Sequence, residues 1–414
     1  MKIKSKEQII EHFTSGNKNN QFIGVENEKF LFKKQNNKRA EYNDLLKVFN
    51  IFIQKFNWQA IKEDENTIGL KKNGKTITLE PGNQIELSGS QLSNIHEVCS
   101  ESYEFQEKLN LACEDIGLTT LSVGYDPFSN IDKIPNNPKK RYKVMTEEMP
   151  KNGPLSLEMM YLTAGTQINI DYKNEEDFKK KFKVASYLTP LSIALFSNSA
   201  IKENKFSGYL SYRSNVWQKT SRAGLPEVFL DEMSFEKYAD FVLDYPLLFL
   251  QKNNEYQFPD GKKYSDLIKQ DEADKKNLEL HLSTIFTEVR LKSYIEVRSL
   301  DACEWDCHCA GPAFFIGLLY GNLDETYEII KKWSKKNILE AYFSSPSKGF
   351  NTEIDGKNIL YWSDIFTKLS KEGLKSRNQL NSKKRDETIY LKNIDKMIIK
   401  KSTKAEDSIK NLIK

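Results

Sequence analysis

The chain has 414 residues, a net charge of +4 and 39% hydrophobic residues, which is enough apolar material for a sizeable core. It contains no apolar stretch of membrane-spanning length, and its N-terminus leads into a polar segment, so we expect neither a membrane span nor a secretory signal. Five cysteines, an odd number, are typical of a reducing compartment and predict a cytoplasmic protein. The mixed charge gives no global indication of nucleic acid binding.

We expect a single domain spanning 1–414, because the chain shows no repeat, low-complexity linker or clean boundary. Apolar residues at helical spacing predict helices at 5–14, 42–56, 93–116, 174–196, 234–243 and 312–334. Alternating residues predict strands at 24–32, 79–87, 118–125, 166–172, 208–217 and 288–298. The segment 155–162 fits either a helical turn or a strand, and 126–140 is expected to be a long functional or mobile loop.

The segment from Thr67 to Glu80 is predicted to be a hairpin, because Asn73-Gly74 separates two alternating runs. Residues 69–76 also match the P-loop pattern letter by letter. A P-loop needs a buried strand before it and a helix after it, whereas here a strand follows and ends at Pro81-Gly82. We therefore interpret the P-loop match as coincidental.

The run from Glu288 to Arg298 alternates strictly between polar and apolar residues, which predicts one strand with a charged face. An outer strand with its polar side in water would give the same pattern. However, acidic and amide side chains recur on one face of three other predicted strands, at Glu26, Glu28, Glu80, Gln84, Glu86, Gln167, Asn169 and Asp171. Divalent cations prefer carboxylate oxygens, so this recurrence favours a metal site.

Arginine is rare in this chain, with 8 residues against 54 lysines. The guanidinium fork grips carboxylate or phosphate through two hydrogen bonds, which lysine cannot do. We therefore expect anion binding where arginine is retained, at Arg141, Arg213, Arg222, Arg290 and Arg298. A structural ion pair or hydrogen bond is the alternative for Arg222 and Arg290.

The C-terminal segment 366–414 is basic, with 14 lysines and arginines against 6 acidic residues. A nucleic acid or membrane contact is one interpretation of this charge. An apolar stripe that includes Ile394, Met397 and Ile398 favours the other, a solvated helical layer over the core. We expect this basic helical layer, with no nucleic acid and no membrane as partner.

Several motifs occur in the same order as in the plant and proteobacterial type of glutamate–cysteine ligase, which this chain resembles over most of residues 20–330. The runs that carry the resemblance are Gly24-Val-Glu-Asn-Glu-Lys-Phe30, Leu79-Glu-Pro-Gly-Asn-Gln-Ile-Glu-Leu-Ser88, Arg141-Tyr142, Met149-Pro150-Lys151, Gln167-Ile-Asn-Ile-Asp171, Leu210-Ser-Tyr-Arg-Ser-Asn-Val-Trp217 and Glu288-Val-Arg-Leu-Lys-Ser-Tyr-Ile-Glu-Val-Arg298. No single run is specific, but the ordered set is.

The resemblance implies an α+β protein with a glutamine-synthetase-like fold, in which an antiparallel sheet is curved into a half-barrel with flanking helices. It implies that ATP phosphorylates the side-chain carboxylate of L-glutamate and that the amine of L-cysteine then displaces phosphate. The product would be γ-glutamylcysteine, in the first step of glutathione biosynthesis. The alternatives are a ligase of the same fold with a different amine acceptor and a non-catalytic nucleic-acid-binding protein. A monomer or a homodimer is expected.

The resemblance also implies roles for individual residues. Magnesium ions would be held by Glu26, Glu28, Glu80, Glu86 and Glu296. Arg298 and Glu296 would be catalytic, with Arg298 near the transferring phosphoryl group. Substrate would be contacted by Arg213, Arg222, Arg290, Gln167 and Asn169.

Two local features need separate expectations. The family often has His where this chain has Asn27, and we expect little effect because the flanking glutamates are kept. The segment 303–309 is dense in cysteine, but the spacing is irregular for a zinc site. Plant members have a redox-sensitive disulfide between cysteines that resemble Cys99 and Cys309, so a redox-active pair is a hypothesis here, and two buried thiols are the other interpretation.

Overall fold

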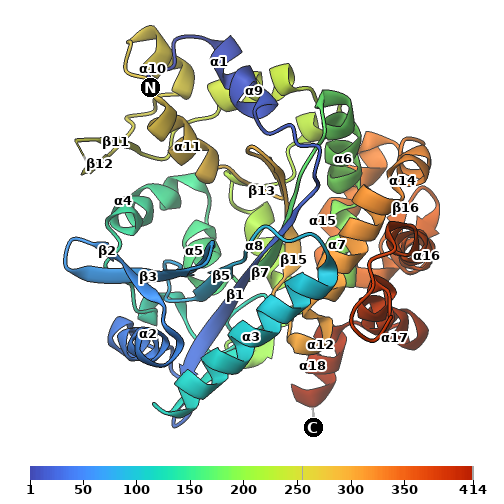
Figure 1. Ribbon diagram of the computed structural model, residues 1–414, viewed down its shortest axis with the longest axis horizontal. Helices are drawn as coiled ribbons and strands as arrows, with labels where there is room; N and C mark the ends of the chain where they lie inside the picture. Colours follow the sequence, from blue (N-terminus) through green and yellow to red (C-terminus); the bar gives the residue numbers. More distant parts are fainter. Residues whose placement is uncertain (254, 413–414) are drawn as a thin grey trace.

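An open antiparallel sheet forms the centre of the molecule in the computed structural model, which describes residues 1–253 and 255–412 (Figure 1). The strands lie in the order β14, β15, β7, β1, β5, β4, β3, β2, and β6 pairs with the far end of β1. Their bounds are β1 Ile23–Lys33, β2 Gln59–Glu63, β3 Asn66–Lys72, β4 Lys75–Leu79, β5 Ile85–Ser88, β6 Leu118–Leu121, β7 Gly165–Ile170, β14 Val289–Leu291 and β15 Ile295–Asp301.

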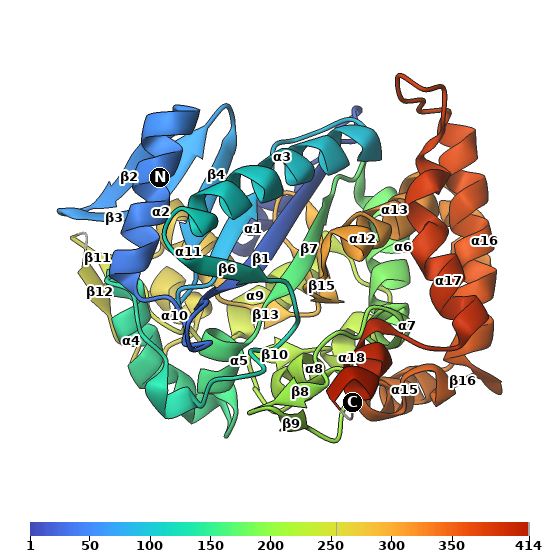
Figure 2. The same cartoon turned by 90° about the horizontal axis from the view of Figure 1, so that it is seen from below.

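Short strand pairs lie outside the sheet, and helices surround it (Figure 2). The short strands are β8 Ile201–Lys202, β9 Lys205–Phe206, β10 Ala223–Gly224, β11 Leu250–Lys252, β12 Glu255–Gln257, β13 Phe286–Thr287, β16 Glu353–Ile354 and β17 Lys357–Asn358. The helices of the first half are α1 Lys6–Thr14, α2 Tyr42–Phe56, α3 Ile95–Glu114, α4 Lys140–Glu148, α5 Ser156–Leu162, α6 Glu175–Tyr187, α7 Thr189–Leu195 and α8 Tyr212–Gln218. Those of the second half are α9 Phe235–Asp244, α10 Tyr264–Lys269, α11 Lys275–Ser283, α12 Trp305–His308, α13 Ala310–Ile316, α14 Leu323–Ile330, α15 Lys335–Lys348, α16 Ile359–Arg377, α17 Lys392–Lys400 and α18 Lys404–Leu412.

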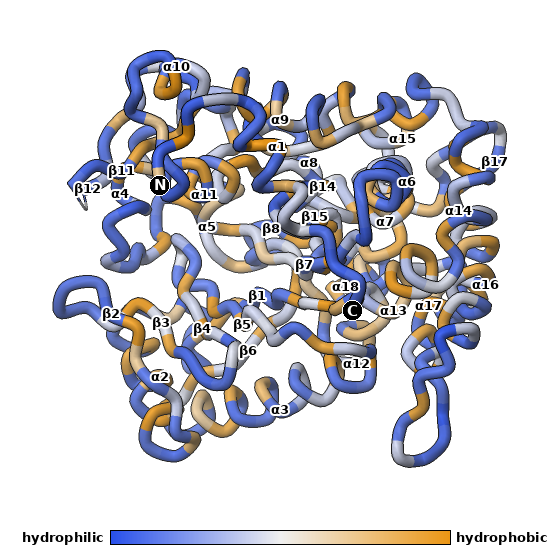
Figure 3. The backbone as a smooth tube through the Cα atoms, turned by 45° about the horizontal axis from the view of Figure 1, so that its top comes forward, coloured by the Kyte–Doolittle hydropathy of each residue, from blue (hydrophilic) through white to orange (hydrophobic). Residues whose placement is uncertain are grey.

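The predicted hairpin is confirmed as β3 and β4, which are joined at Asn73-Gly74. Both turn residues have positive φ, 49° and 80°, the left-handed conformation that Asn and Gly adopt most easily. The hairpin extends the sheet at the end opposite the C-terminal helices α16 and α17 (Figures 1 and 2). In Figure 3 the turn between β2 and β3 is hydrophilic, as its position at the sheet's edge requires.

The prediction of one strand at 288–298 is wrong, because the run folds back on itself. Lys292 donates its backbone N–H to the carbonyl of Tyr294 at 2.8 Å, and β14 and β15 pair antiparallel on either side of this turn. Arg290 and Glu296 therefore lie directly opposite each other. The alternation survives because both strands of a hairpin can present residues of one parity to the same face.

Four other expectations need correction. The predicted strand 79–87 is divided, because β4 ends at Leu79, the chain turns at Pro81-Gly82 and β5 begins at Ile85. The predicted strand 208–217 contains α8, whose first turn is capped by the Ser211 hydroxyl. The predicted helix 174–196 is two helices, because the chain turns at Leu188 before Pro190 starts the first turn of α7. The predicted helix 312–334 is divided by a π-helical turn at Gly317–Gly321, where the helix approaches α16 so closely that a Cβ at Gly321 would meet backbone atoms of Gly373.

The apolar faces of the central strands are buried in two main clusters. The larger cluster joins Ile168, Ile170, Ile295 and Val297 to the helices between α6 and α17. The smaller one packs α2 and α3 against β3, β4 and β5. Because the apolar side chains of the strands are buried in these clusters, the polar side chains of the same strands lie together on the opposite face of the sheet.

Candidate active site

The strand register brings the predicted polar residues into rows across the sheet. On β1, Glu26 lies opposite Gln167 of β7 and Ser88 of β5. Glu28 lies opposite Glu86 of β5, and Asn169 of β7 lies opposite Glu296 of β15. Residues that are far apart in sequence therefore share one face, as the parity of the strands predicts.

Amide side chains tie these rows together. Asn169 donates to Glu26 at 2.9 Å, and Gln167 donates to Glu28 at 3.1 Å. The oxygen of Gln167 in turn accepts a hydrogen bond from Arg298. Gln167 thus connects a glutamate of β1 to the arginine of β15 and fixes the orientation of both.

Glu296 is fully buried and surrounded by three cations. Its Oε2 accepts from Nε of Arg290 at 2.6 Å and lies 3.3 Å from a guanidinium nitrogen of Arg298, while its Oε1 lies 2.6 Å from Nζ of Lys292. Burial alone would raise the pKa of this carboxyl, but the three cations outweigh it and hold the pKa well below its usual range. Both oxygens are therefore already neutralised.

The other glutamates of the face are crowded with like charges. Burial and the charge of Glu80 raise the pKa of Glu28 to about 7. Burial, together with Glu26, Glu80 and Glu28, raises the pKa of Glu86 well above its ordinary value. Carboxylates arranged in this way disfavour their own ionisation, and a cation between them would relieve that repulsion.

Glu80 lies just beyond β4, where the chain turns at Pro81-Gly82. Its carboxylate accepts from the hydroxyl of Tyr142 at 3.4 Å, and Arg141 donates to the same hydroxyl at 3.1 Å. Next to them the buried ammonium of Lys139 is bonded to the carbonyl of Leu79 at 2.6 Å. The motif Arg141-Tyr142 therefore lies beside Glu80, with Arg141, one of the arginines expected to bind anions, bonded to the hydroxyl of Tyr142.

Arg213 and Arg298 both lie over the indole of Trp217, with their guanidinium carbons 4.2 Å and 5.4 Å from the centre of its ring system. Arg213 is buried and donates from one nitrogen to the carbonyl of Arg298 at 2.9 Å. Its Nε and its second terminal nitrogen have no hydrogen-bond partner in the described part of the chain. A buried fork with free donors is suited to an anionic group of a substrate. Sequence reasoning missed Trp217, because 208–217 was predicted to be a strand and the position of Trp217 about one helical turn after Arg213 was therefore not recognised.

The other two predicted substrate-binding arginines are occupied by the protein itself. Arg222 donates to the carbonyl of Thr284 at 3.3 and 3.1 Å and to that of Pro246 at 2.7 Å. Arg290 donates to Glu296 and to the carbonyls of Ser283 and Ile285 at the end of α11. Both guanidinium groups therefore connect loops and helix ends to the sheet, which is the structural alternative left open for them.

No three acidic, histidine or cysteine side chains among the described residues lie close enough to enclose a metal ion together. The donor set of Glu26, Glu28 and Glu86 nevertheless fits a hard divalent cation, since all its ligands are carboxylates, and burial together with neighbouring glutamates raises the pKa of Glu28 and of Glu86. Glu296 fits less well, because its charge is already balanced by Arg290, Lys292 and Arg298.

The two cysteines of the hypothetical redox pair are joined in the structure. Cys99 of α3 and Cys309, which precedes α13, form a disulfide with their Cα atoms 6.0 Å apart. Cys113 is a free, buried thiol.

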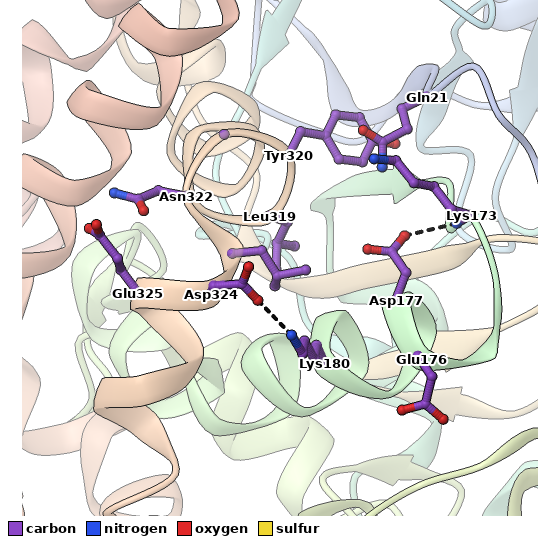
Figure 4. A pocket seen from close by; sticks show the side chains of 12 residues that line it. Gln21, Lys173, Glu176, Asp177, Lys180, Leu319, Tyr320, Asn322, Asp324 and Glu325 are labelled. Atoms are coloured by element: carbon purple, nitrogen blue, oxygen red, sulfur yellow. Dashed lines mark hydrogen bonds and ion pairs between the residues drawn. The ribbon is translucent and has the colours of Figure 1, made fainter.

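A pocket of about 540 Å³ lies away from this polar face, between α6 and the segment that joins α13 to α14 (Figure 4). Its charges are largely paired, as Lys180 binds Asp324 at 2.6 Å and the Asp177 carboxylate accepts from the backbone N–H of Lys173 at 2.8 Å. None of the predicted site residues line it. We therefore place the candidate active site on the polar face of the sheet.

An antiparallel sheet that presents a cluster of glutamates beside buried arginines is suited to an enzyme that transfers a phosphoryl group, such as a ligase that activates a carboxylate with ATP before joining it to an amine. The fold agrees with this class. A solved structure of glutamate–cysteine ligase from Francisella tularensis in complex with AMP superposes with a TM-score of 0.57 at 13% identity, over 95% of this chain and 85% of that one. This likeness confirms the predicted glutamine-synthetase-like fold.

The chain belongs to glutamate–cysteine ligase family 2, whose family model matches residues 22–410. Glutamate–cysteine ligase B, chloroplastic, of Oryza sativa subsp. japonica is 35% identical over 416 residues, covering 97% of this chain and 83% of the relative. The chloroplastic enzyme of Nicotiana tabacum is 36% identical over 387 residues, covering 90% and 74%. The predicted membership of this ligase family is confirmed.

The predicted cytoplasmic location is wrong by the same comparison. The curated relatives from rice, tobacco and Arabidopsis thaliana are all named as chloroplastic enzymes. The number of cysteines indicates whether a compartment is reducing but does not identify the compartment. The inference of a cytoplasmic location from the cysteines therefore failed. No helix within 1–253 and 255–412 has both the length and the apolar character needed to span a bilayer.

Proposed function

We propose that this chain joins L-glutamate to L-cysteine at the polar face of the sheet, with ATP as co-substrate and Mg²⁺ as the metal. The observation that carries the proposal is the glutamate cluster of Glu26, Glu28 and Glu86 next to Arg298 and the free donors of Arg213. An oxygen of the glutamate side chain attacks the γ-phosphorus of ATP, and ADP leaves. The cysteine nitrogen then attacks the acyl carbon, phosphate leaves, and the nitrogen loses a proton.

Phosphoryl transfer depends mainly on positioning and charge neutralisation. In this proposal Glu26, Glu28, Glu80 and Glu86 hold Mg²⁺, which supplies neutralisation of the phosphate oxygens when it is bound. Arg298, held by Gln167 and Glu296, contributes a further positive charge to the phosphoryl group. Because three cations already balance Glu296, its role is to position Arg298 and not to bind metal.

Arg213 is the proposed contact for a carboxylate of glutamate, since it is buried, planar and has unused donors. Gln167 and Asn169 lie on the polar face of β7 and orient Glu28 and Glu26 of β1 through hydrogen bonds. Arg222 and Arg290 act indirectly, because all the donors described for them bind the protein's own carbonyls and Glu296.

Redox control through Cys99 and Cys309 is part of the proposal. The disulfide ties α3, which covers β1, to the start of α13, which packs against β7. Its reduction would loosen two elements that support strands of the site. Equal activity with and without dithiothreitol, in a protein whose oxidation state at both cysteines is verified by mass spectrometry, would contradict this role.

The test of the function is ADP release with MgATP and glutamate across a series of amines, combined with identification of the product. Release that requires both glutamate and cysteine, with a γ-linked dipeptide as product, supports the proposal. Turnover with another amine but not with cysteine would favour the second candidate, a ligase of the same fold with a different acceptor. Absence of ADP release with every amine would contradict both.

A further inference from the structure

The turn between β4 and β5 carries Glu80, one of the proposed metal ligands. Two backbone hydrogen bonds lie within this turn: the N–H of Glu80 donates to the carbonyl of Gln84 at 2.8 Å, and the N–H of Asn83 donates to the carbonyl of Glu80 at 2.9 Å. Asn83 has φ 61°, in the left-handed region, and Pro81 has no N–H to donate. The place of the Glu80 carboxylate therefore depends on the groups that hold the turn from outside.

Arg39, in the segment between β1 and α2, lies against this turn. It is buried, with 4% of the residue exposed. One terminal nitrogen of its guanidinium donates to the carboxylate of Asp126 at 2.6 Å, and the other donates to the carbonyl of Gly82. The guanidinium carbon lies 4.4 Å from the centre of the Phe30 ring on β1. Arg39 thus connects the turn of Glu80 to β1 and to Asp126.

Asp126 is itself held firmly. It is fully buried, and its Oδ1 accepts from the N–H groups of Phe128 and Ser129, both at 2.9 Å, while its Oδ2 accepts from Arg39. Its own N–H donates to the carbonyl of Leu162, at the end of α5, at 2.9 Å. Because both carboxylate oxygens are bonded, Asp126 holds the guanidinium of Arg39 in one orientation.

The segment 126–140, predicted to be a functional or mobile loop, also bonds the turn near its other end. The side-chain amide of Asn137, which is 6% exposed, donates to the carbonyl of Glu80 at 2.7 Å. The loop therefore holds the turn at two points, through Asp126 and Arg39 at the carbonyl of Gly82 and through Asn137 at the carbonyl of Glu80.

We infer that Arg39, oriented by Asp126, positions Glu80 for metal binding by holding the carbonyl of Gly82. This inference rests on the proposed function, in which Glu80 is a ligand of Mg²⁺. Arg39 acts through the backbone of the turn and is therefore a positioning residue. Its planar fork donates to a carboxylate and to a carbonyl in fixed directions, which the ammonium of lysine does not reproduce. Loss of a group that orients a metal ligand typically weakens metal binding by about 10–100-fold.

The test compares Arg39→Lys with the matched control Arg377→Lys. Arg377 also donates to a fully buried carboxylate, that of Glu387 at 3.1 Å, and to a backbone carbonyl, that of Ser93 at 3.1 Å. Neither partner is a proposed metal ligand or belongs to the turn of Glu80. Both substitutions keep the positive charge and remove the fork, so both should lower the melting temperature.

Metal affinity separates the two variants. Binding of Mn²⁺, a paramagnetic probe in place of Mg²⁺, is measured by electron paramagnetic resonance on the full chain without nucleotide or amino acid. We expect Arg39→Lys to raise the dissociation constant of Mn²⁺ roughly tenfold or more and Arg377→Lys to leave it unchanged. In the ADP-release assay, Arg39→Lys should need roughly tenfold more MgCl₂ for its half-maximal rate, with the KM for cysteine unchanged.

Asn137→Ala is a second variant, which removes a neutral amide and leaves no charge unbalanced. It should weaken Mn²⁺ binding in the same direction, and it decides the matter if Arg39→Lys does not fold. Lowered melting temperatures with wild-type Mn²⁺ affinity in the Arg39 and Asn137 variants would show a purely structural role and overturn the inference alone. A wild type that binds no Mn²⁺ would contradict the metal role of Glu80 as well.

Discussion

Replacing Glu296 by Gln tests how the hairpin organises the site. The substitution preserves the shape of the side chain and removes the charge that balances Arg290, Lys292 and Arg298, whose nitrogens lie 2.6, 2.6 and 3.3 Å from its oxygens. The variant would bury three cations around a neutral amide. We expect it to be both less stable and inactive, because Arg298 loses its anchor.

The size of the stability loss follows from burial. Removing one partner of a buried ion pair costs about 3–5 kcal/mol. With a melting entropy of about 2.1 cal/mol/K per residue, that loss lowers the melting temperature of a chain of this length by roughly 3–6 °C. The pKa of Glu296 is depressed, so its contribution is present above the unfolded-state pKa of about 4.5 and is lost as the pH falls below it.

Calorimetry at several pH values measures this effect, with Glu279→Gln as the matched control. Glu279 is exposed and its carboxylate lies 3.8 Å from the ammonium of Lys275. The substitution should therefore change the free energy of unfolding by no more than about 0.5 kcal/mol. The double variant Arg290→Met with Glu296→Gln should regain part of the stability, because one unbalanced charge is removed with its partner. A melting temperature of Glu296→Gln within a degree of wild type at pH 7 would refute the reasoning.

Three further predictions concern charge, anion binding and redox state. The pKa of Glu28 is raised to about 7, so the folded state binds more protons than the unfolded chain between about pH 4.5 and 7, and metal-free stability should fall as the pH rises through that window. The stabilisation by MgCl₂ over NaCl, measured by thermal melting, should accordingly be larger at pH 8 than at pH 5.5. Arg213→Lys should raise the KM for glutamate at least tenfold with little change in melting temperature, whereas Arg222→Met should mainly lower the melting temperature. Cys99→Ser should abolish the response of activity to dithiothreitol.

Each of these predictions has a contradicting result. Equal stabilisation by Mg²⁺ at pH 5.5 and pH 8 would remove the glutamate cluster as the metal site. A KM unchanged in Arg213→Lys, or raised equally in Arg222→Met, would remove the distinction drawn between the two arginines. A dithiothreitol response that persists in Cys99→Ser would assign redox control to other cysteines.

The face of the site could be predicted from the sequence because side-chain direction in a strand has a period of two. Glu26, Glu28, Gln167 and Asn169 follow that rule, and the register of β1 and β7 brings them together as expected. The alternation at 288–298 gave the correct face but not the turn, since Lys292, Ser293 and Tyr294 include neither Gly nor Asn to signal one.

The hydrogen-bond acceptors of the arginines could not be predicted from the sequence, because a guanidinium donates to backbone carbonyls as readily as to the anionic groups of a substrate. Arg290 lies in the same motif as Arg298, and Arg222 follows the motif that carries Arg213. Only the tertiary structure shows that the donors of Arg222 and Arg290 are used by the carbonyls of Thr284, Pro246, Ser283 and Ile285. The helix α8 was mistaken for a strand because it is short and buried on nearly all sides, which removes the helical periodicity from its sequence.

Transfer of ¹⁸O tests the central claim most directly. Glutamate labelled with ¹⁸O in its side-chain carboxylate is incubated with MgATP and cysteine, and the phosphorus products are analysed by mass spectrometry. Activation by phosphorylation predicts ADP and one ¹⁸O in each inorganic phosphate, dependent on cysteine for turnover. AMP that carries the label, with pyrophosphate as the second product, would show adenylation and contradict the account.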